Sequence, residues 1–283
     1  MLSNLIIEKH VRAALEEDLG HGHDITSNLL IPAGERAKAA FVAREDGVLA
    51  GLIVALSTFS LIDPDFDMVI HAQDGDEIKA GFTIAEIEGP ARSLLTAERV
   101  ALNFMSHMSG IATMTRIFTD EITGTGAEVC DTRKTLPGLR AFQKYAVSVG
   151  GGSNHRFGLD DAILIKDNHI AVAGGIDQAL QQVALIAGHT LKIEIEVDTL
   201  EQLEEVLASG HAHIVMLDNM DTNTLEKAVK MIKASEHKIT TEASGGVTLE
   251  TVRAIAETGV DYISVGRITQ SAPAIDIGLD YIS

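Results

Sequence analysis

The sequence predicts an α/β protein built on a (β/α) barrel that need not be complete, with a smaller domain attached. From residue 127 onward, short apolar stretches typical of strands alternate with stretches typical of helices. From the third strand on, the pair recurs about every two dozen residues, which indicates parallel strands joined by right-handed crossovers. A length of 283 residues suits this architecture. An open doubly wound sheet is the alternative.

The predicted barrel elements are short apolar runs and the amphipathic stretches between them. The strands are expected at 127–130, 162–165, 191–197, 214–217, 239–242 and 262–265. The helices are expected at 139–147, 175–187, 199–208, 221–234 and 248–258.

The first third of the chain has a different pattern. Residues 2–17 carry apolar side chains at helical spacing, and residues 38–88 are predicted to form short strands and turns separated by glycines. Residues 93–122 are predicted to be helical, with a break at Ser109-Gly110.

Composition excludes several classes of protein. The formal net charge of −19 argues against nucleic-acid binding, which requires a basic face. The chain has no run of eighteen apolar residues, so no membrane span is predicted. The first residues lack the pattern of a signal peptide, and the single cysteine, Cys130, permits no intrachain disulfide. Together these observations predict a cytoplasmic protein. Cys130 lies within an apolar strand, where a buried, inert thiol is expected.

Polar residues gather just after the predicted strands. In a (β/α) barrel these positions meet at the carboxyl end of the strands, where active sites are built. An active site is therefore predicted from the segments Asp131–Lys134, Lys166–His169, Asp218–Asn219, Ser244–Gly246 and Gly266–Arg267.

One of these groups of residues is cationic. Arginine binds carboxylates and phosphates through two parallel hydrogen bonds, and lysine acts as a compact charge, so clustered bases predict a substrate with several negative charges. For two of the bases, Arg140 and Lys144, the alternative is an exposed helix face, because they lie four residues apart. The cluster consists of Arg133, Lys134, Arg140, Lys144, His155, Arg156 and Lys166.

A second group is acidic. Glu194 and Glu196 lie on one face of the third strand by its period of two, and Asp218 comes directly after the next strand. Carboxylates at neighbouring strand ends suit Mg²⁺ or a ribose diol, and we expect Glu196 and Asp218 to provide them. The alternative is an ion pair with Lys166 or Lys192.

Two glycine-containing loops follow the last two strands. Glycines at Ser244-Gly245-Gly246 and at Val265-Gly266-Arg267 let backbone N–H groups approach a phosphate. The loops after the last strands are the usual phosphate position in such barrels.

Several of these segments together resemble the motifs of the quinolinate phosphoribosyltransferase family, from about residue 15 to the end of the sequence. Asp131–Arg140, Gly150–Arg156 and Ile165–His169 carry the strongest similarity. Shorter matches are Thr96–Arg99, Glu194–Asp198, Leu217–Asn219 and Ser244–Gly246.

The resemblance implies an N-terminal α/β sandwich domain, residues 1–112, and an incomplete (β/α) barrel, residues 113–271, with residues 272–283 returning to the first domain. It implies conversion of quinolinate and phosphoribosyl pyrophosphate to nicotinate mononucleotide, pyrophosphate and CO₂, with Mg²⁺ as cofactor. It also implies a homo-oligomer, a dimer or an assembly of dimers, in which Arg99 reaches the neighbouring subunit's site.

The resemblance also assigns roles to residues. Arg133, His155, Arg156 and Lys166 would hold the two carboxylates of quinolinate. Lys134 and Lys166 would face the pyrophosphate, and Glu196 and Asp218 would serve the ribose and Mg²⁺; these four are the expected catalytic residues. The remaining substrate-binding residues, mostly around the 5′-phosphate, would be Thr132, Ser244, Gly245, Gly246, Val265, Gly266 and Arg267. Gln270 stands where relatives often carry a basic residue, which leaves phosphate affinity open.

Three alternatives remain at this stage. A related phosphoribosyltransferase of the kind associated with molybdenum transport would act on another heterocyclic acid. A Schiff-base aldolase would use Lys166 as its nucleophile. A barrel without catalysis would only bind anions, but the paired carboxylates argue against it because they would repel an anion.

Overall fold

A computed structural model describes residues 2–282, which form two compact units. The first unit comprises Met1–Arg116, Leu136–Gly151 and Ile268–Ser283. The second comprises Ile117–Thr135 and Gly152–Arg267. The sequence analysis expected domain boundaries after residues 112 and 271, and these boundaries remain a prediction.

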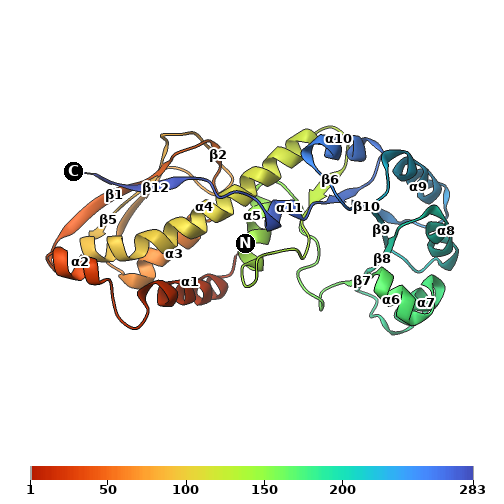
Figure 1. The fold of residues 1–283 in the computed structure, drawn as a ribbon, viewed down its shortest axis with the longest axis horizontal. Helices are drawn as coiled ribbons and strands as arrows, with labels where there is room; N and C mark the ends of the chain where they lie inside the picture. The colour runs from red at the N-terminus through yellow and green to blue at the C-terminus, as the bar shows by residue number, and fades with distance from the viewer. Residues whose placement is uncertain (1, 283) are drawn as a thin grey trace. The chain divides into compact units, whose positions relative to one another are not determined.

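The first unit is a mixed α/β structure whose main sheet is antiparallel (Figure 1). The four-stranded sheet has the order β12-β1-β5-β3, and a separate two-stranded sheet pairs β2 with β4. Its helices are α1 (Asn4–Leu19), α2 (Ile25–Leu30), α3 (Leu52–Ile62), α4 (Ala91–Glu121) and α5 (Arg140–Val149). Its strands are β1 (Arg36–Ala43), β2 (Gly47–Val48), β3 (Asp67–Ile70), β4 (Glu77–Ile78), β5 (Thr83–Pro90) and β12 (Ile277–Ile282).

The core of this unit lies between the antiparallel sheet and helices α3 and α4. Phe41 of β1 and Phe59 of α3 are fully buried, and their rings meet edge to face with centroids 5.7 Å apart. Helix α3 corrects the sequence analysis, which expected only strands and turns between residues 38 and 88. Eight of its eleven residues are apolar and they include its first five in a row, so no helical periodicity could be recognised.

Helix α4 is continuous, so the break predicted at Ser109-Gly110 was wrong. Gly110 is helical, and a Cβ added there would lie 1.9 Å from the carbonyl oxygen of Pro273. Ser109 is also engaged, because its hydroxyl accepts from the N–H of Ala50 at 2.9 Å and donates to the Ala50 carbonyl. Small residues here permit close packing of the chain against the helix rather than ending it.

The second unit contains the predicted parallel sheet. Each strand pairs in parallel with its neighbour in the order β6-β11-β10-β9-β8-β7. The strands are β6 (Glu128–Cys130), β7 (Ile163–Ile165), β8 (Ile193–Val197), β9 (Ile214–Asp218), β10 (Thr240–Ser244) and β11 (Tyr262–Ser264). They all match the sequence prediction to within two residues.

Strand order identifies this sheet as an incomplete (β/α) barrel. The strands from β7 to β11 follow one another without a reversal, whereas a doubly wound sheet reverses its order at a switch point. Strands β6 and β7 lie at the two ends of the order, and within residues 2–282 no ladder joins them. The fold class is therefore the one expected.

Helices connect successive strands of the barrel. Figure 1 shows α8, α9 and α10 on the outer side of the strands. Thr199 and Asp221 cap the first turns of α8 and α9, each accepting a backbone N–H three residues on. The helices are α6 (Asp167–Ala173), α7 (Ile176–Ile186), α8 (Leu200–Ser209), α9 (Thr222–Ala234) and α10 (Leu249–Glu257), with the short α11 (Arg267–Gln270) after β11. Within the described residues, no helix combines the length and apolarity that crossing a membrane would require.

Candidate active site

A cavity of about 520 Å³ opens at the carboxyl ends of the barrel strands. The loops after β6, β7, β9 and β10 and the segment before β7 contribute its walls. This is the position at which (β/α) barrels place their chemistry. The lining residues are Thr132, Arg133, Lys134, His155, Arg156, Leu164, Lys166, Glu196, Met216, Asp218, Asn219, Glu242, Ser244, Gly245, Gly246 and Ser264.

Two arginines present unused donors in this part of the barrel. The Nε atoms of Arg133 and Arg156 are buried and have no hydrogen-bond partner among the described residues. Burial lowers the pKa of Arg156, and the positive charge of Arg133 lowers it further. A buried donor without an acceptor costs about 1–3 kcal/mol, which an anion bound between the two guanidinium groups would offset.

The carboxylates expected to hold a metal or ribose also lie at the cavity. Glu196 Oε2 accepts a hydrogen bond from Lys166 Nζ in an ion pair. The structure therefore contains the ion pair with Lys166 that the sequence analysis gave as the alternative. Asp218 accepts a hydrogen bond from Asn219 Nδ2 at 2.5 Å. Lys166 precedes α6, and its backbone N–H donates to His169 Nδ1 at 2.9 Å. Helix and strand together fix the two members of the ion pair.

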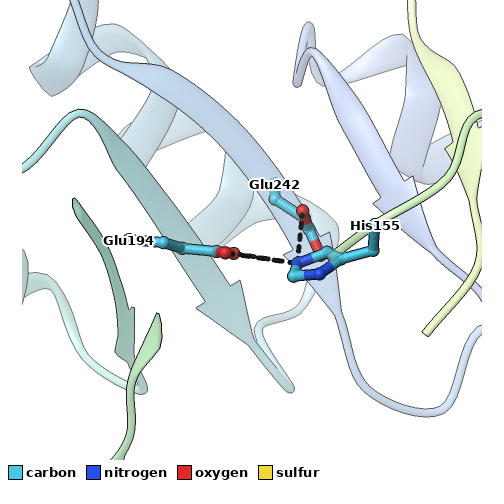
Figure 2. A group of neighbouring side chains, drawn as sticks. All are labelled: His155, Glu194 and Glu242. Carbon is cyan, nitrogen blue, oxygen red and sulfur yellow. Dashed lines mark hydrogen bonds and ion pairs between the residues drawn. The ribbon is translucent and has the colours of Figure 1, made fainter. Parts of the chain in front are cut away.

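Two residues of the cavity wall, His155 and Glu242, form a group with the buried Glu194 (Figure 2). His155 Nε2 is 3.2 Å from Glu194 Oε2 and 3.6 Å from Glu242 Oε2. Glu194 and Glu242 are only 3% and 4% exposed. Burial raises the pKa of Glu242 to about 7, and the charge of Glu194 adds to the rise.

The same three residues form the one cluster of potential metal ligands found among the described residues. Their ligating atoms lie within 4.8 Å of one another. A hydrogen bond from the imidazole to Glu194, with the Glu242 carboxylate 3.6 Å from the same nitrogen, accounts for this spacing.

Sequence reasoning missed Glu242. It lies in β10 two residues before Ser244, so the period of a strand turns both side chains to the same face. That alternation, which places Glu242 on the same face as the predicted site residue Ser244, was the available signal.

The glycine loop after β10 is tied to the loop after β9. Gly245 has φ +95°, and a Cβ there would lie 2.2 Å from Asn219 Oδ1. Asn219 itself has φ +54°, which is uncommon for a residue with a side chain. These close contacts leave room only for glycine at position 245, and they bring the Asp218 carboxylate next to the Ser244–Gly246 backbone.

The structure brings most of the predicted site residues into the one cavity. The residues that do so are Thr132, Arg133, Lys134, His155, Arg156, Lys166, Glu196, Asp218, Ser244, Gly245 and Gly246. Four do not line it: Arg99, Val265, Gly266 and Arg267.

The positions of these four residues differ. Gly266 lies beside the wall, since a Cβ there would be 3.0 Å from Lys134 Cδ. The Val265 N–H donates to the Cys130 carbonyl at 2.9 Å, and Arg267 begins α11 with an exposed side chain. Arg99 is exposed on α4.

Two cationic residues of the sequence cluster also lie outside this cavity. Arg140 and Lys144 belong to α5 of the first unit and are absent from the cavity lining. Lys144 is buried, so it is not part of an exposed helix face as the alternative supposed. Cys130 is buried as expected.

Comparison with known proteins gives consistent matches along the chain. The family models described as quinolinate phosphoribosyl transferase, N-terminal domain and C-terminal domain, match residues 24–109 and 111–280. A probable nicotinate-nucleotide pyrophosphorylase (carboxylating) from Bacillus subtilis strain 168 is 45% identical over 280 residues, covering 99% of this chain and 94% of the relative. The nicotinate-nucleotide pyrophosphorylase (carboxylating) of Mycobacterium leprae is 45% identical over 272 residues, covering 95% of each.

Solved structures agree with these sequence matches. The nicotinate-nucleotide pyrophosphorylase of Francisella tularensis superposes with a TM-score of 0.94 at 39% identity, covering 100% of this chain and 98% of that one. The corresponding protein of Ehrlichia chaffeensis gives a TM-score of 0.93 at 41% identity, with 99% of each chain covered.

Proposed function

The chain belongs to the quinolinate phosphoribosyltransferase family, and from this premise we propose how its cavity carries out the reaction. It is a pentosyltransferase of pyridine nucleotide and NAD biosynthesis that converts quinolinate and phosphoribosyl pyrophosphate to nicotinate mononucleotide, pyrophosphate and CO₂. The observation that carries the assignment of its site is a single cavity lined by both cationic side chains and carboxylates.

The cations bind the diacid. Arg133 and Arg156 each offer a buried Nε without a partner, and Lys166 adds a point charge beside them. Two carboxylates of quinolinate would accept these donors in charge-assisted hydrogen bonds. The pyridine ring is thereby held with its nitrogen facing the ribose.

Phosphoribosyl pyrophosphate would occupy another part of the same cavity. Lys134 faces its pyrophosphate, while Ser244, Gly245 and Gly246 offer backbone N–H groups to the 5′-phosphate. Thr132 and the residues around Gly266 border this region, since Gly266 packs against Lys134. We place Val265 and Arg267 in supporting positions at the same loop.

Glu196 and Asp218 would hold a magnesium ion if Lys166, which pairs with Glu196, turned to the anionic substrate. Both line the cavity, and carboxylate oxygens are the ligands that Mg²⁺ prefers. When bound, Mg²⁺ would neutralise charge on the pyrophosphate. The same carboxylates would stabilise positive charge that develops on the ribose.

The reaction then proceeds in two steps. The pyridine nitrogen forms a bond to C1 of the ribose as the bond from C1 to the pyrophosphate oxygen breaks, through a state that resembles an oxocarbenium ion. The C2 carboxylate next leaves as CO₂; its bonding electrons stay on the ring carbon, stabilised by the positive nitrogen, and that carbon takes a proton from water. The protein contributes mainly position and charge.

An oligomer, at least a dimer, is part of the proposal. Arg99 is exposed on α4 and would complete the site of a neighbouring subunit. The cytoplasmic location stays a prediction from the sequence.

The decisive assay mixes the protein with quinolinate labelled at its C2 carboxyl group, phosphoribosyl pyrophosphate and Mg²⁺. We expect release of labelled CO₂ and an equal amount of nicotinate mononucleotide, both requiring phosphoribosyl pyrophosphate. Turnover of another heterocyclic acid without release from quinolinate would refute the assignment. Borohydride with a carbonyl substrate should leave Lys166 unmodified, because no Schiff base forms.

A further inference from the structure

Both ring nitrogens of His155 are already engaged by the protein. Its Nδ1 accepts a hydrogen bond from the backbone N–H of Arg156, at 2.8 Å. Its Nε2 faces the carboxylates of Glu194 and Glu242 (Figure 2). A neutral imidazole has one acceptor and one donor nitrogen, so the proton lies on Nε2, where it is donated to Glu194, while the Glu242 carboxylate lies 3.6 Å away.

An imidazolium would not fit this arrangement. It would carry a proton on Nδ1 as well, and that N–H would face the N–H of Arg156 at a distance that suits only a hydrogen bond. The ring is enclosed as well, with 11% of its side chain exposed. The geometry favours a neutral ring whose donor points to the buried glutamates.

The segment that carries Arg156 is held at several points. The N–H of His155 donates to Oδ1 of Asp131, a residue with no exposed surface, at 3.0 Å. The next N–H along the chain, that of Arg156, is held by the imidazole. The guanidinium is fixed separately, because Nη1 donates to the Ala162 carbonyl at 3.1 Å. These contacts orient Arg156 and leave its buried Nε available.

We infer that His155 is a positioning residue, which links the backbone of Arg156 to the buried carboxylates of Glu194 and Glu242. It does not bind a carboxylate of quinolinate as a cation. This inference rests on the proposed function, in which Arg156 binds the diacid. It differs from the role that the family resemblance implied for His155. Glu194 and Glu242 then belong to the same positioning group.

Two amide variants separate the two sides of the ring. The oxygen of asparagine can take the place of Nδ1, while the longer glutamine side chain can reach toward the glutamates with its NH₂ group. We expect His155→Gln to raise the KM for quinolinate by about tenfold, the worth of one hydrogen bond, and to leave the KM for phosphoribosyl pyrophosphate unchanged. His155→Asn should recover most of that loss. Equal loss in both variants would overturn the inference, because each removes a cation.

The tautomer can be measured in the wild-type protein itself, and a variant is needed only to assign the signals. With ¹⁵N-labelled histidine, the Nδ1 of His155 should resonate as an unprotonated nitrogen and the Nε2 as a protonated one, with and without quinolinate. The His155→Asn protein assigns the signals by their disappearance. An imidazolium, or a proton on Nδ1, would overturn the inference whatever the kinetics show.

This measurement also separates the inference from the function on which it rests. If the protein released no CO₂ from quinolinate but showed the expected tautomer, the proposed function would fail and the positioning of Arg156 would stand. If it released CO₂ but showed an imidazolium, the proposed function would stand and the positioning role of His155 would fail.

Discussion

The backbone N–H of Asn219 donates to the carbonyl oxygen of Ser244 across 2.9 Å, which joins the loop after β9 to the loop after β10. Asp218 is the last residue of β9, directly before the first loop, and the second loop carries the glycines proposed to bind the 5′-phosphate. The proposed ribose and phosphate subsites are therefore joined by a backbone hydrogen bond.

Gly245→Ala should damage this connection. The added Cβ would lie 2.2 Å from Asn219 Oδ1, in a backbone conformation with φ +95° that strains any residue with a side chain. We expect the KM for phosphoribosyl pyrophosphate to rise by about tenfold or more, with little change for quinolinate. Gly246→Ala is the matched control, because it also has a positive φ but meets no atom within 4 Å. Equal effects would show that backbone strain alone matters.

Arg133→Ala should remove most of the affinity for quinolinate. The change deletes a guanidinium that could make two charge-assisted hydrogen bonds, each worth about 1.5–3 kcal/mol. We expect the KM for quinolinate to rise at least about a hundredfold, measured by CO₂ release. Arg133→Lys should restore only part of the loss, since an ammonium lacks the fork geometry. Arg12→Ala, on the exposed face of α1, serves as control. A wild-type KM in Arg133→Ala would show that this residue does not bind the diacid.

Arg99 and Arg133 should complement each other in mixed oligomers. If Arg99 completes a neighbour's site, Arg99→Ala and Arg133→Ala will each be nearly inactive alone. Mixed dimers would then regain one native site, because one subunit supplies Arg99 and the other supplies Arg133. Co-refolding the two variants at equal amounts should recover about a quarter of wild-type activity. Failure to recover any activity, in a sample shown to contain mixed dimers, would place Arg99 outside the partner's site.

Glu242 should make the protein less stable as the pH rises. Its pKa is raised to about 7 in the folded state, so between about 4.5 and 7 the folded protein binds this proton more tightly than the unfolded chain. The resulting stabilisation is complete below that window and is lost as the pH rises through 7. The free energy of unfolding of Glu242→Gln, relative to wild type, should rise by roughly 1–3 kcal/mol from pH 5 to pH 8. Urea unfolding at four pH values measures this. Glu204→Gln, at an exposed site on α8, should show no such trend.

Much of the barrel could be predicted because its strands and helices alternate with clear periods. That pattern also predicts that Arg133, Lys166 and Asp218 line one cavity, since the carboxyl ends of parallel strands share one edge. Helix α3 could not be predicted in the same way. Its first N–H groups, those of Gly51 and Leu52, donate to Asp74, a residue about two dozen positions further along. No local capping signal therefore marks where the helix begins.

The group around His155 shows a second limit. Its partners Glu194 and Glu242 come from β8 and β10, so the cost of burying them is met by contacts that only the folded barrel provides. The helix break expected at Gly110 failed for a related reason. The residue that requires a glycine there, Pro273, is far away in the sequence.

The pairing of β1 with β12 has a consequence for synthesis on the ribosome. Lys38 lies opposite Ile282, and Ala43 lies opposite Ile277. One edge of β1 can therefore be paired only by residues that are synthesised after the entire parallel sheet. Until they emerge, β1 presents an unpaired edge of N–H and C=O groups while the barrel can already fold. A nascent chain paused before residue 277 would thus be a candidate for chaperone binding at β1, an order of events set by strand topology rather than by the chemistry of the site.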